Sequence, residues 1–405
     1  MAKLYIFTGV YPYTQNIECF LEDEIKRLSR CFEDIVVVPT RGDDFKRLVP
    51  SNCFVTQPIF PPPLFFLLKG LYHKRSFKTT WRDFLDNRVY TSIKKLKVWC
   101  RGVLVTNNLL HSPIIKDIEK NLSEDDVCYY YWGKWSNVLS IYWGGKSKHV
   151  SRFHGAWDLW EEDYCDYAPF RKKLSQSLDA AVFISRKGLE YFASKYPVCR
   201  TVFSPLGSED FGVTEKLQTE TISLVSCSSV YPLKRVELIY AAVHQYAAMH
   251  PDKNIRWTHI GGGESFMSLK SEVGTNTLNN LVVNLYGSKS HDDVIGIYSN
   301  EHFDVFINLS TNEGVPVSIM EALSFDIPAV ATNVGATDEV VRDGSGFLVS
   351  PNPTIDEVVS AIDNILTKDF KARDFWNRNY NAEKNYMSFA HFLMSLSTGT
   401  NKEQL

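Results

Sequence analysis

Short apolar runs alternate with longer helical patterns along most of the chain. Near the N-terminus, residues 4–10 and 34–40 are apolar runs on either side of a helical pattern over roughly residues 16–30. Apolar runs of this length, bounded by turn residues, are typical of strands buried on both faces of a parallel sheet. The sequence therefore opens with a predicted strand, helix and strand.

The same alternation continues through both halves of the chain. Helices are predicted over about 234–249, near 291–300 and after Pro316. Strands alternating with helices in this way form doubly wound sheets, so we predict an α/β protein with two Rossmann-like domains. The remaining predicted strands are residues 127–133, 149–155, 180–186, 222–228, 255–261, 281–287, 303–310 and 328–334.

The domain boundary is expected in a turn-rich segment at residues 204–210. A chain of 405 residues is long enough for two or three domains of roughly 150 residues each. We predict an N-terminal domain over 1–205 and a C-terminal domain over 206–379. The last segment, about 380–405, reads as a polar helix with aromatic anchors that could pack back on the first domain.

The composition indicates a folded protein of a reducing compartment. Hydrophobic residues make up 44% and charged residues 22% of the chain, unlike the composition of disordered chains. The eight cysteines stand singly, with no CxxC pair, which indicates neither a zinc site nor a disulfide framework. The N-terminus lacks the pattern of a signal peptide, and no apolar run is long enough to span a membrane. These features predict a cytoplasmic protein.

Charge is distributed unevenly between the halves. Residues 1–200 carry 30 Lys and Arg against 22 Asp and Glu, whereas residues 201–405 carry 14 against 25. The basic excess comes from residues 66–101, which hold ten basic and two acidic side chains and follow a Phe-rich segment. Apolar residues beside a basic cluster suit the surface of an anionic membrane, so residues 64–101 are a candidate membrane contact. A solvated basic helix beside a core loop is the alternative.

Two glutamates near a predicted helix start form the most informative pattern. Glu313 and Glu321 are eight residues apart, and Pro316 suits the first turn of a helix between them. Glu313 is then expected in a loop and Glu321 about five residues into the helix, ~7.5 Å along its axis. Two such carboxylates can accept hydrogen bonds from vicinal hydroxyls of a ribose or a pyranose. Ordinary helix-start and helix-surface positions remain the alternative.

A second candidate is the glycine triplet 261–263, which follows a predicted strand and precedes a probable helix. Small residues there would let backbone amides and a helix N-terminus face a phosphate. A plain tight turn is the alternative. The chain has neither a P-loop nor a GxGxxG fingerprint, so no dinucleotide-binding motif is present.

Residues 310–341 resemble the Glu-x7-Glu motif of retaining glycosyltransferases of the family 4 type. These enzymes have the GT-B fold, two facing Rossmann-like domains with a cleft between them. The resemblance extends to further segments in family order, which are residues 11–25, 129–132, 151–162, 225–239, 257–263 and 285–298.

The resemblance implies roles for individual residues. Glu313 would contact hydroxyls of the donor sugar, Glu321 would hold the ribose, and Lys234 would bind the diphosphate. His154 would lie near the donor sugar and the attacking hydroxyl, so Glu313, His154 and Lys234 are the candidate catalytic residues. The other donor-binding candidates are Gly9, Ser229, Arg235, Gly262, Gly263, Gly287, Gly314, Val315 and Pro316.

Two departures from the family pattern concern the same site. Ser229 stands where many members have an arginine, so one phosphate contact is missing or is supplied by Arg235 or another residue. Thr14 and Gln15 stand where members often have glycines. Donor affinity and the geometry of the N-terminal loop depend on these positions.

The resemblance implies a retaining hexosyltransferase that needs no metal and no cofactor. Its substrates would be a nucleotide diphosphate sugar and a glycan hydroxyl, on a lipid-linked acceptor of surface polysaccharide synthesis such as capsule, O-antigen or exopolysaccharide. No nucleic-acid partner is expected. The alternatives are a non-catalytic partner subunit that binds nucleotide sugar or glycan, and a nucleotide-sugar epimerase with the same fold.

Overall fold

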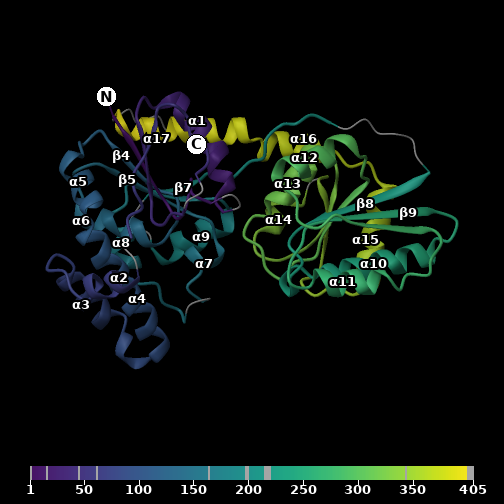
Figure 1. Ribbon diagram of the computed structural model, residues 1–405, viewed down its shortest axis with the longest axis horizontal. Coiled ribbons are helices and arrows are strands. Elements are labelled where there is room, and N and C mark those ends of the chain that lie inside the picture. The colour runs from purple at the N-terminus through teal and green to yellow at the C-terminus, as the bar shows by residue number, and fades with distance from the viewer. Residues whose placement is uncertain are drawn as a thin grey trace. The chain divides into compact units, whose positions relative to one another are not determined.

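The computed structural model divides the chain into two compact units (Figure 1). The first unit comprises Met1–Pro205 and Tyr386–Leu405, and the second comprises Leu206–Asn385. The structure describes residues 2–14, 17–43, 46–60, 63–162, 165–196, 200–213, 220–342 and 344–398. Gln15 and the end of the predicted C-terminal helix, residues 399–405, lie outside this part.

A seven-stranded parallel sheet forms the centre of the first unit, in the order β3-β2-β1-β4-β5-β6-β7. The five strands predicted here are confirmed, and β3 and β7 at the two edges were not predicted. The strands are β1 (Leu4–Thr8), β2 (Ile35–Pro39), β3 (Cys53–Val55), β4 (Val127–Tyr130), β5 (Lys148–Phe153), β6 (Ala180–Phe183) and β7 (Arg200–Phe203).

Helices cover both faces of this sheet (Figure 1). The basic region, for which no helix bounds were predicted, is helical: α2 (Pro63–Gly70), α3 (Phe77–Asp86) and α4 (Ile93–His111) form a helical layer, with α2 packed on α4. The bounds could not be predicted because charged side chains interrupt the apolar period of these helices. The other helices are α1 (Cys19–Cys31), α5 (Pro113–Asn121), α6 (Ser140–Trp143), α7 (Ala156–Leu159), α8 (Arg171–Ser175) and α9 (Arg186–Lys195).

The C-terminal helix α17 (Ala382–Ser397) runs into the first unit. Its buried residues Phe389, Phe392 and Leu393 belong to one core cluster with strand residues such as Ile6 and Val37. In the part of the chain that is described, no helix combines the length and the apolar character that crossing a bilayer needs.

A buried ion pair lies in the same core. Arg152 on β5 and Glu24 on α1 are both fully buried, and the Nη1 of Arg152 donates to Glu24 Oε2 at 2.5 Å. The Arg152 guanidinium also donates to Ser204 Oγ and lies 4.1 Å from the centre of the Phe389 ring. This one side chain therefore connects β5, α1 and α17.

The second unit contains a six-stranded parallel sheet in the order β10-β9-β8-β11-β12-β13. All five predicted strands are confirmed, and β13 was not predicted. The strands are β8 (Thr221–Cys227), β9 (Asn254–Ile260), β10 (Leu281–Leu285), β11 (Val305–Asn308), β12 (Ala329–Thr332) and β13 (Gly346–Val349). The helices are α10 (Val236–Met249), α11 (Phe266–Val273), α12 (His291–Asn300), α13 (Val317–Ser324), α14 (Thr337–Val340), α15 (Ile355–Thr367) and α16 (Ala372–Asn379).

Candidate active site

The loops that leave the carboxyl ends of β8 and β11 meet in the second unit. Pro232–Lys234 form a short 3-10 turn after β8, and the backbone amide of Thr311 donates to Leu233 O at 2.8 Å. This contact brings Lys234 next to Glu313, whose carboxylate lies in the loop after β11 as predicted. The Nζ of Lys234 donates to Glu313 Oε1 at 2.6 Å.

Glu313 has a second partner in Asn308, the last residue of β11. The Nδ2 of Asn308 lies 3.3 Å from Glu313 Oε1, while Asn308 Oδ1 accepts from the Ser310 hydroxyl and amide. These two acceptor contacts orient the amide so that its donor faces the carboxylate. The sequence analysis did not identify Asn308, because a strand-end asparagine alone indicates no chemistry.

Glu321 occupies the fifth position of α13, the place that the sequence predicted. It is 9% exposed, and its Oε1 lies 3.0 Å from the Nε2 of His291, the first residue of α12. The side chain of His291 is 51% exposed, so the imidazole is accessible to solvent while the carboxylate of Glu321 is largely buried. His291 was not predicted as a site residue, although it lies in one of the segments that resemble the family.

Arg235 holds the loops of this region together. Its Nε and Nη2 donate to the carbonyl oxygens of Leu309, Ser310 and Pro351, and burial lowers its pKa. Most of its donors are thus engaged by backbone, and a phosphate would compete with these carbonyls. Its role as a substitute for the arginine missing at exposed Ser229 stays a prediction.

The glycine triplet lies between the ends of β8, β9 and β10. A Cβ on Gly261 would lie 1.8 Å from Ser228 O, so no larger residue fits while the loops keep this approach. Gly262 O accepts from the Val230 amide at 2.8 Å, and Gly287 O accepts from the Gly261 amide at 3.0 Å. A Cβ on Gly263 would lie 2.5 Å from Val230 O. The triplet therefore brings three strand-end loops together, and its contact with a phosphate stays a prediction.

The loop that carries Glu313 is supported by the loop after β12. Gly314 O accepts from the Ala336 amide at 3.1 Å, and a Cβ on Gly335 would lie 1.8 Å from Glu313 O. Gly335 has φ +56°, a conformation that favours glycine, and it was not predicted as important. Val315 is buried and Pro316 caps α13, so this loop places Glu313 on a rigid support.

In the first unit, His154 follows β5. Its backbone amide donates to both carboxylate oxygens of Asp158 at 3.0 and 3.1 Å, and its Nδ1 lies 3.7 Å from Asp158 Oδ2. The ring centres of Tyr131 and Trp132 lie 4.7 and 4.5 Å from that of His154. Neither ring nitrogen of His154 has a hydrogen-bond partner among the described residues. The imidazole is thus oriented by packing, and both of its ring nitrogens are buried.

A carboxylate of the protein itself occupies the backbone amides at Gly9, one of the predicted donor-binding residues. Glu18, at the start of α1, accepts from the backbone amides of Gly9, Val10 and Tyr11 at 2.7, 2.8 and 2.5 Å, and from the indole of Trp132. Consecutive amides of this kind form a nest for an anion. Donor binding by Gly9 stays a prediction, and a diphosphate would compete with Glu18 for these amides.

Replacing Glu18 with alanine is expected to lower the free energy of unfolding by at least about 2 kcal/mol, since charge-assisted bonds to several amides are lost. Chemical denaturation measures this change. Glu33→Ala, an exposed glutamate of the same unit, should change stability by less than about 0.5 kcal/mol. Equal effects of the two substitutions would show that the nest contributes nothing.

Comparison with known proteins adds a further observation for the second unit. Residues 208–382 match the family model of glycosyl transferases group 1. This stretch contains the Lys234–Glu313 pair, the Glu321–His291 pair and the glycine triplet. No curated protein sequence matches the chain.

Solved structures resemble the chain over nearly its whole length. The lipopolysaccharide outer core galactosyltransferase WaaB in its apo form is 13% identical with a TM-score of 0.63, and the match covers 96% of this chain and 99% of that one. HepE of Anabaena in complex with UDP is 15% identical with a TM-score of 0.65, covering 98% and 100%.

Sucrose-phosphate synthase of Thermosynechococcus elongatus is 13% identical with a TM-score of 0.68, and the match covers 99% of this chain and 100% of that one. At identities this low, the structural likeness establishes the fold alone, and this fold is GT-B. The fold class predicted from the sequence is confirmed. The family match and the fold together support a glycosyltransferase.

Proposed function

We propose that the chain is a retaining glycosyltransferase of the family 4 type that transfers a hexose from a nucleotide diphosphate sugar to a glycan hydroxyl. The observation that carries the proposal is the Lys234–Glu313 ion pair at 2.6 Å. Glu321 follows eight residues after Glu313, on helix α13. One cation and two carboxylates are thus presented from two adjoining loops and from helix α13, within the unit that matches the family model.

Each of these side chains suits one part of such a donor. The carboxylate of Glu313 accepts hydrogen bonds from sugar hydroxyls, and Glu321 accepts from the ribose hydroxyls beside His291. The ammonium of Lys234 stabilises the charge that develops on the diphosphate as it leaves. Because this charge is larger in the transition state than in the bound donor, the contact accelerates transfer. The reaction as proposed needs no metal or cofactor.

Retention is proposed without a covalent sugar–enzyme intermediate. The departing phosphate takes the proton of the incoming hydroxyl on the face of the sugar from which it leaves, and His154 lies beside this hydroxyl. The experiment is the anomeric configuration of the product, read by NMR from an α-linked donor sugar. An α-linked product supports the proposal, and a β-linked product rules out the retaining mechanism.

The acceptor is proposed to be a lipid-linked glycan of surface polysaccharide synthesis. Support comes from α2, α3, α4 and the segments that join them, where large apolar side chains are exposed in a stretch rich in basic residues. The most exposed of them, Ile93 and Leu71, are 74% and 72% exposed. The side chain of Leu64, at the start of the predicted contact region 64–101, lies outside the described residues.

Vesicle flotation tests this membrane contact. Full-length protein should float with vesicles containing anionic phosphatidylglycerol at low salt, and Lys94→Glu with Lys97→Glu should weaken binding at least tenfold, at about 1 kcal/mol per basic residue lost. Lys270→Glu with Lys368→Glu makes the same charge change on exposed positions of the second unit. Flotation that is absent for the wild type, or equal for both double variants, would contradict the contact.

A further inference from the structure

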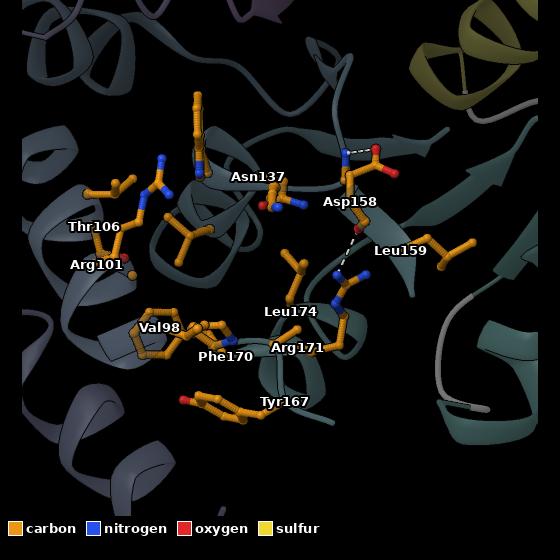
Figure 2. Close-up of a pocket in the computed structure, with 18 of the residues that line it drawn as sticks. Val98, Arg101, Thr106, Asn137, Asp158, Leu159, Tyr167, Phe170, Arg171 and Leu174 are labelled. Atoms are coloured by element: carbon orange, nitrogen blue, oxygen red, sulfur yellow. Dashed lines mark hydrogen bonds between the residues drawn. The ribbon is translucent and has the colours of Figure 1, made fainter. Parts of the chain in front are cut away.

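Charged side chains near the strand ends of the first unit are held by protein partners. Figure 2 shows this at a cavity of about 420 Å³, where Arg171 donates to the backbone carbonyl of Asp158 at 2.8 Å. The carboxylate of Asp158 accepts from the backbone amides of Gly133 and His154. Asp158 therefore holds loops together. A carboxylate near the end of β11 in the second unit is held on one side only.

This carboxylate is that of Glu313, and its two oxygens differ. Oε1 accepts from Lys234 Nζ at 2.6 Å and lies 3.3 Å from Asn308 Nδ2. Oε2 has no hydrogen-bond partner among the described residues, and it does not belong to their fully buried unpartnered atoms. The side chain as a whole is 13% exposed. Oε2 is therefore the oxygen that can accept from a ligand.

Lys234 alone is a weak anchor for this carboxylate. Its side chain is 26% exposed and ends a flexible four-carbon stem. In the proposed function its ammonium also binds the diphosphate, and a shift toward the phosphate would lengthen its contact with Oε1. A second and stiffer donor is then needed to keep Oε2 in one direction.

Asn308 has the properties of such a donor. It is 7% exposed and is the last residue of β11. Its Oδ1 accepts from the Ser310 hydroxyl at 2.7 Å and from the Ser310 backbone amide at 3.1 Å. Because a backbone N–H can only donate, the oxygen of the Asn308 side chain faces Ser310 and its NH₂ group faces Glu313.

Ser310 is itself fixed by two further elements. It is fully buried, and its carbonyl oxygen accepts from the Thr332 hydroxyl at 2.6 Å and from Arg235 Nη2 at 3.0 Å. Thr332 is the last residue of β12, and Arg235 directly precedes α10. A chain of hydrogen bonds thus extends from these elements through Ser310 and Asn308 to Glu313.

We propose that Asn308 is a positioning residue, which holds the Glu313 carboxylate through Oε1 so that Oε2 accepts from a hydroxyl of the donor sugar. The identity of this ligand rests on the proposed function. Asn308 acts through Glu313 and touches no substrate, so the nucleoside diphosphate is bound without it. Its loss therefore impairs transfer of the sugar and leaves the affinity for the nucleotide unchanged.

Asn308→Asp tests the proposal by exchanging one group. The acceptor for Ser310 is kept, while the NH₂ group that faces Glu313 becomes an oxygen of a second carboxylate and repels it. We expect ligand-free crystal structures at neutral pH to show the Glu313 side chain in a different rotamer in this variant than in the wild type. Asn308→Ala should also release Glu313, and it is informative if the first variant does not fold.

Kinetics distinguish positioning from general damage to the site. The donors assayed are UDP-glucose, UDP-galactose and GDP-mannose, with UDP and GDP as the binding probes. In Asn308→Asp, kcat should fall by about 10-fold to 100-fold, since small misplacements of a substrate contact cost this much. The dissociation constant of the nucleoside diphosphate should stay within twofold of the wild-type value. A purely structural role would weaken both.

Asn300→Asp is the matched control, because it makes the same change at an exposed residue of α12 in the same unit. It should leave kcat, nucleotide affinity and the Glu313 rotamer as in the wild type.

Two results would overturn the proposal. The Glu313 side chain could keep its wild-type position in both Asn308 variants, or nucleotide affinity could fall as far as kcat does. The crystal structures require no turnover, so they decide whether Asn308 positions Glu313 even if the wild type uses none of the donors. Absence of turnover would count against the proposed function alone.

Discussion

Lys234→Ala is expected to lower the turnover of donor and acceptor by about 100-fold to 1000-fold. Removing one group that stabilises developing charge typically costs this much, about 2.7–4 kcal/mol of the barrier. The loss should appear mainly in kcat, because the ammonium interacts more strongly with the departing diphosphate than with the bound donor. Release of the nucleoside diphosphate under saturating donor measures it.

Lys270→Ala is the matched control for this prediction, since Lys270 is an exposed lysine on α11 of the same unit. Its turnover should equal that of the wild type. A Lys234→Ala protein that retains turnover within threefold would contradict the role of the lysine. If no turnover is found for any protein, but partner or glycan binding survives the substitution, the chain is a binding subunit.

Arg152→Ala is expected to lower the free energy of unfolding of the first unit by about 3–5 kcal/mol. The substitution leaves the Glu24 carboxylate without its cation in a site that is fully buried. It also removes the guanidinium from the face of Phe389, and so weakens the attachment of α17. Denaturant unfolding followed by circular dichroism should show the loss as an earlier transition.

Two further variants distinguish the buried charge from lost packing. Arg152→Met together with Glu24→Leu removes both charges at similar volume, so it should recover most of the stability. Arg200→Ala is the control: it removes an exposed arginine of β7 whose guanidinium lies 5.2 Å from the ring centre of Phe392 on α17. This substitution should lower the free energy of unfolding by less than about 1 kcal/mol. A double variant as unstable as Arg152→Ala would show that the ion pair is not the cause.

The central strands could be predicted from the sequence because each is a continuous apolar run with its own turn signals. Three of the edge strands, β3, β7 and β13, could not: β3 has three residues with Phe54 exposed, and β13 begins at a glycine. The short apolar runs at these edges resemble loops. Helices α2 to α4 were missed for a different reason, since their exposed faces carry both apolar and basic residues.

The site was predictable where its residues are close in the chain or follow a family motif, as for Glu313, Glu321 and Lys234. Asn308, His291 and Gly335 act through contacts made by folding. His291 and Gly335 lie in segments that resemble the family, but the sequence of these segments does not indicate the contacts that the two residues make. Glu18 shows the limit most clearly. Its partners include Trp132, which lies 114 positions away, and no local pattern predicts that a carboxylate fills the nest at Gly9.

The most direct test of the nucleotide-sugar site is thermal unfolding with and without UDP, the nucleotide present in the HepE structure. At about 100 times its dissociation constant a ligand stabilises the native state by about 2.7 kcal/mol, which raises the unfolding midpoint visibly. We expect this rise for the wild type and for Glu272→Ala, an exposed control, and its loss in Glu321→Ala. No rise with UDP or any other nucleoside diphosphate, or an undiminished rise in Glu321→Ala, would contradict it.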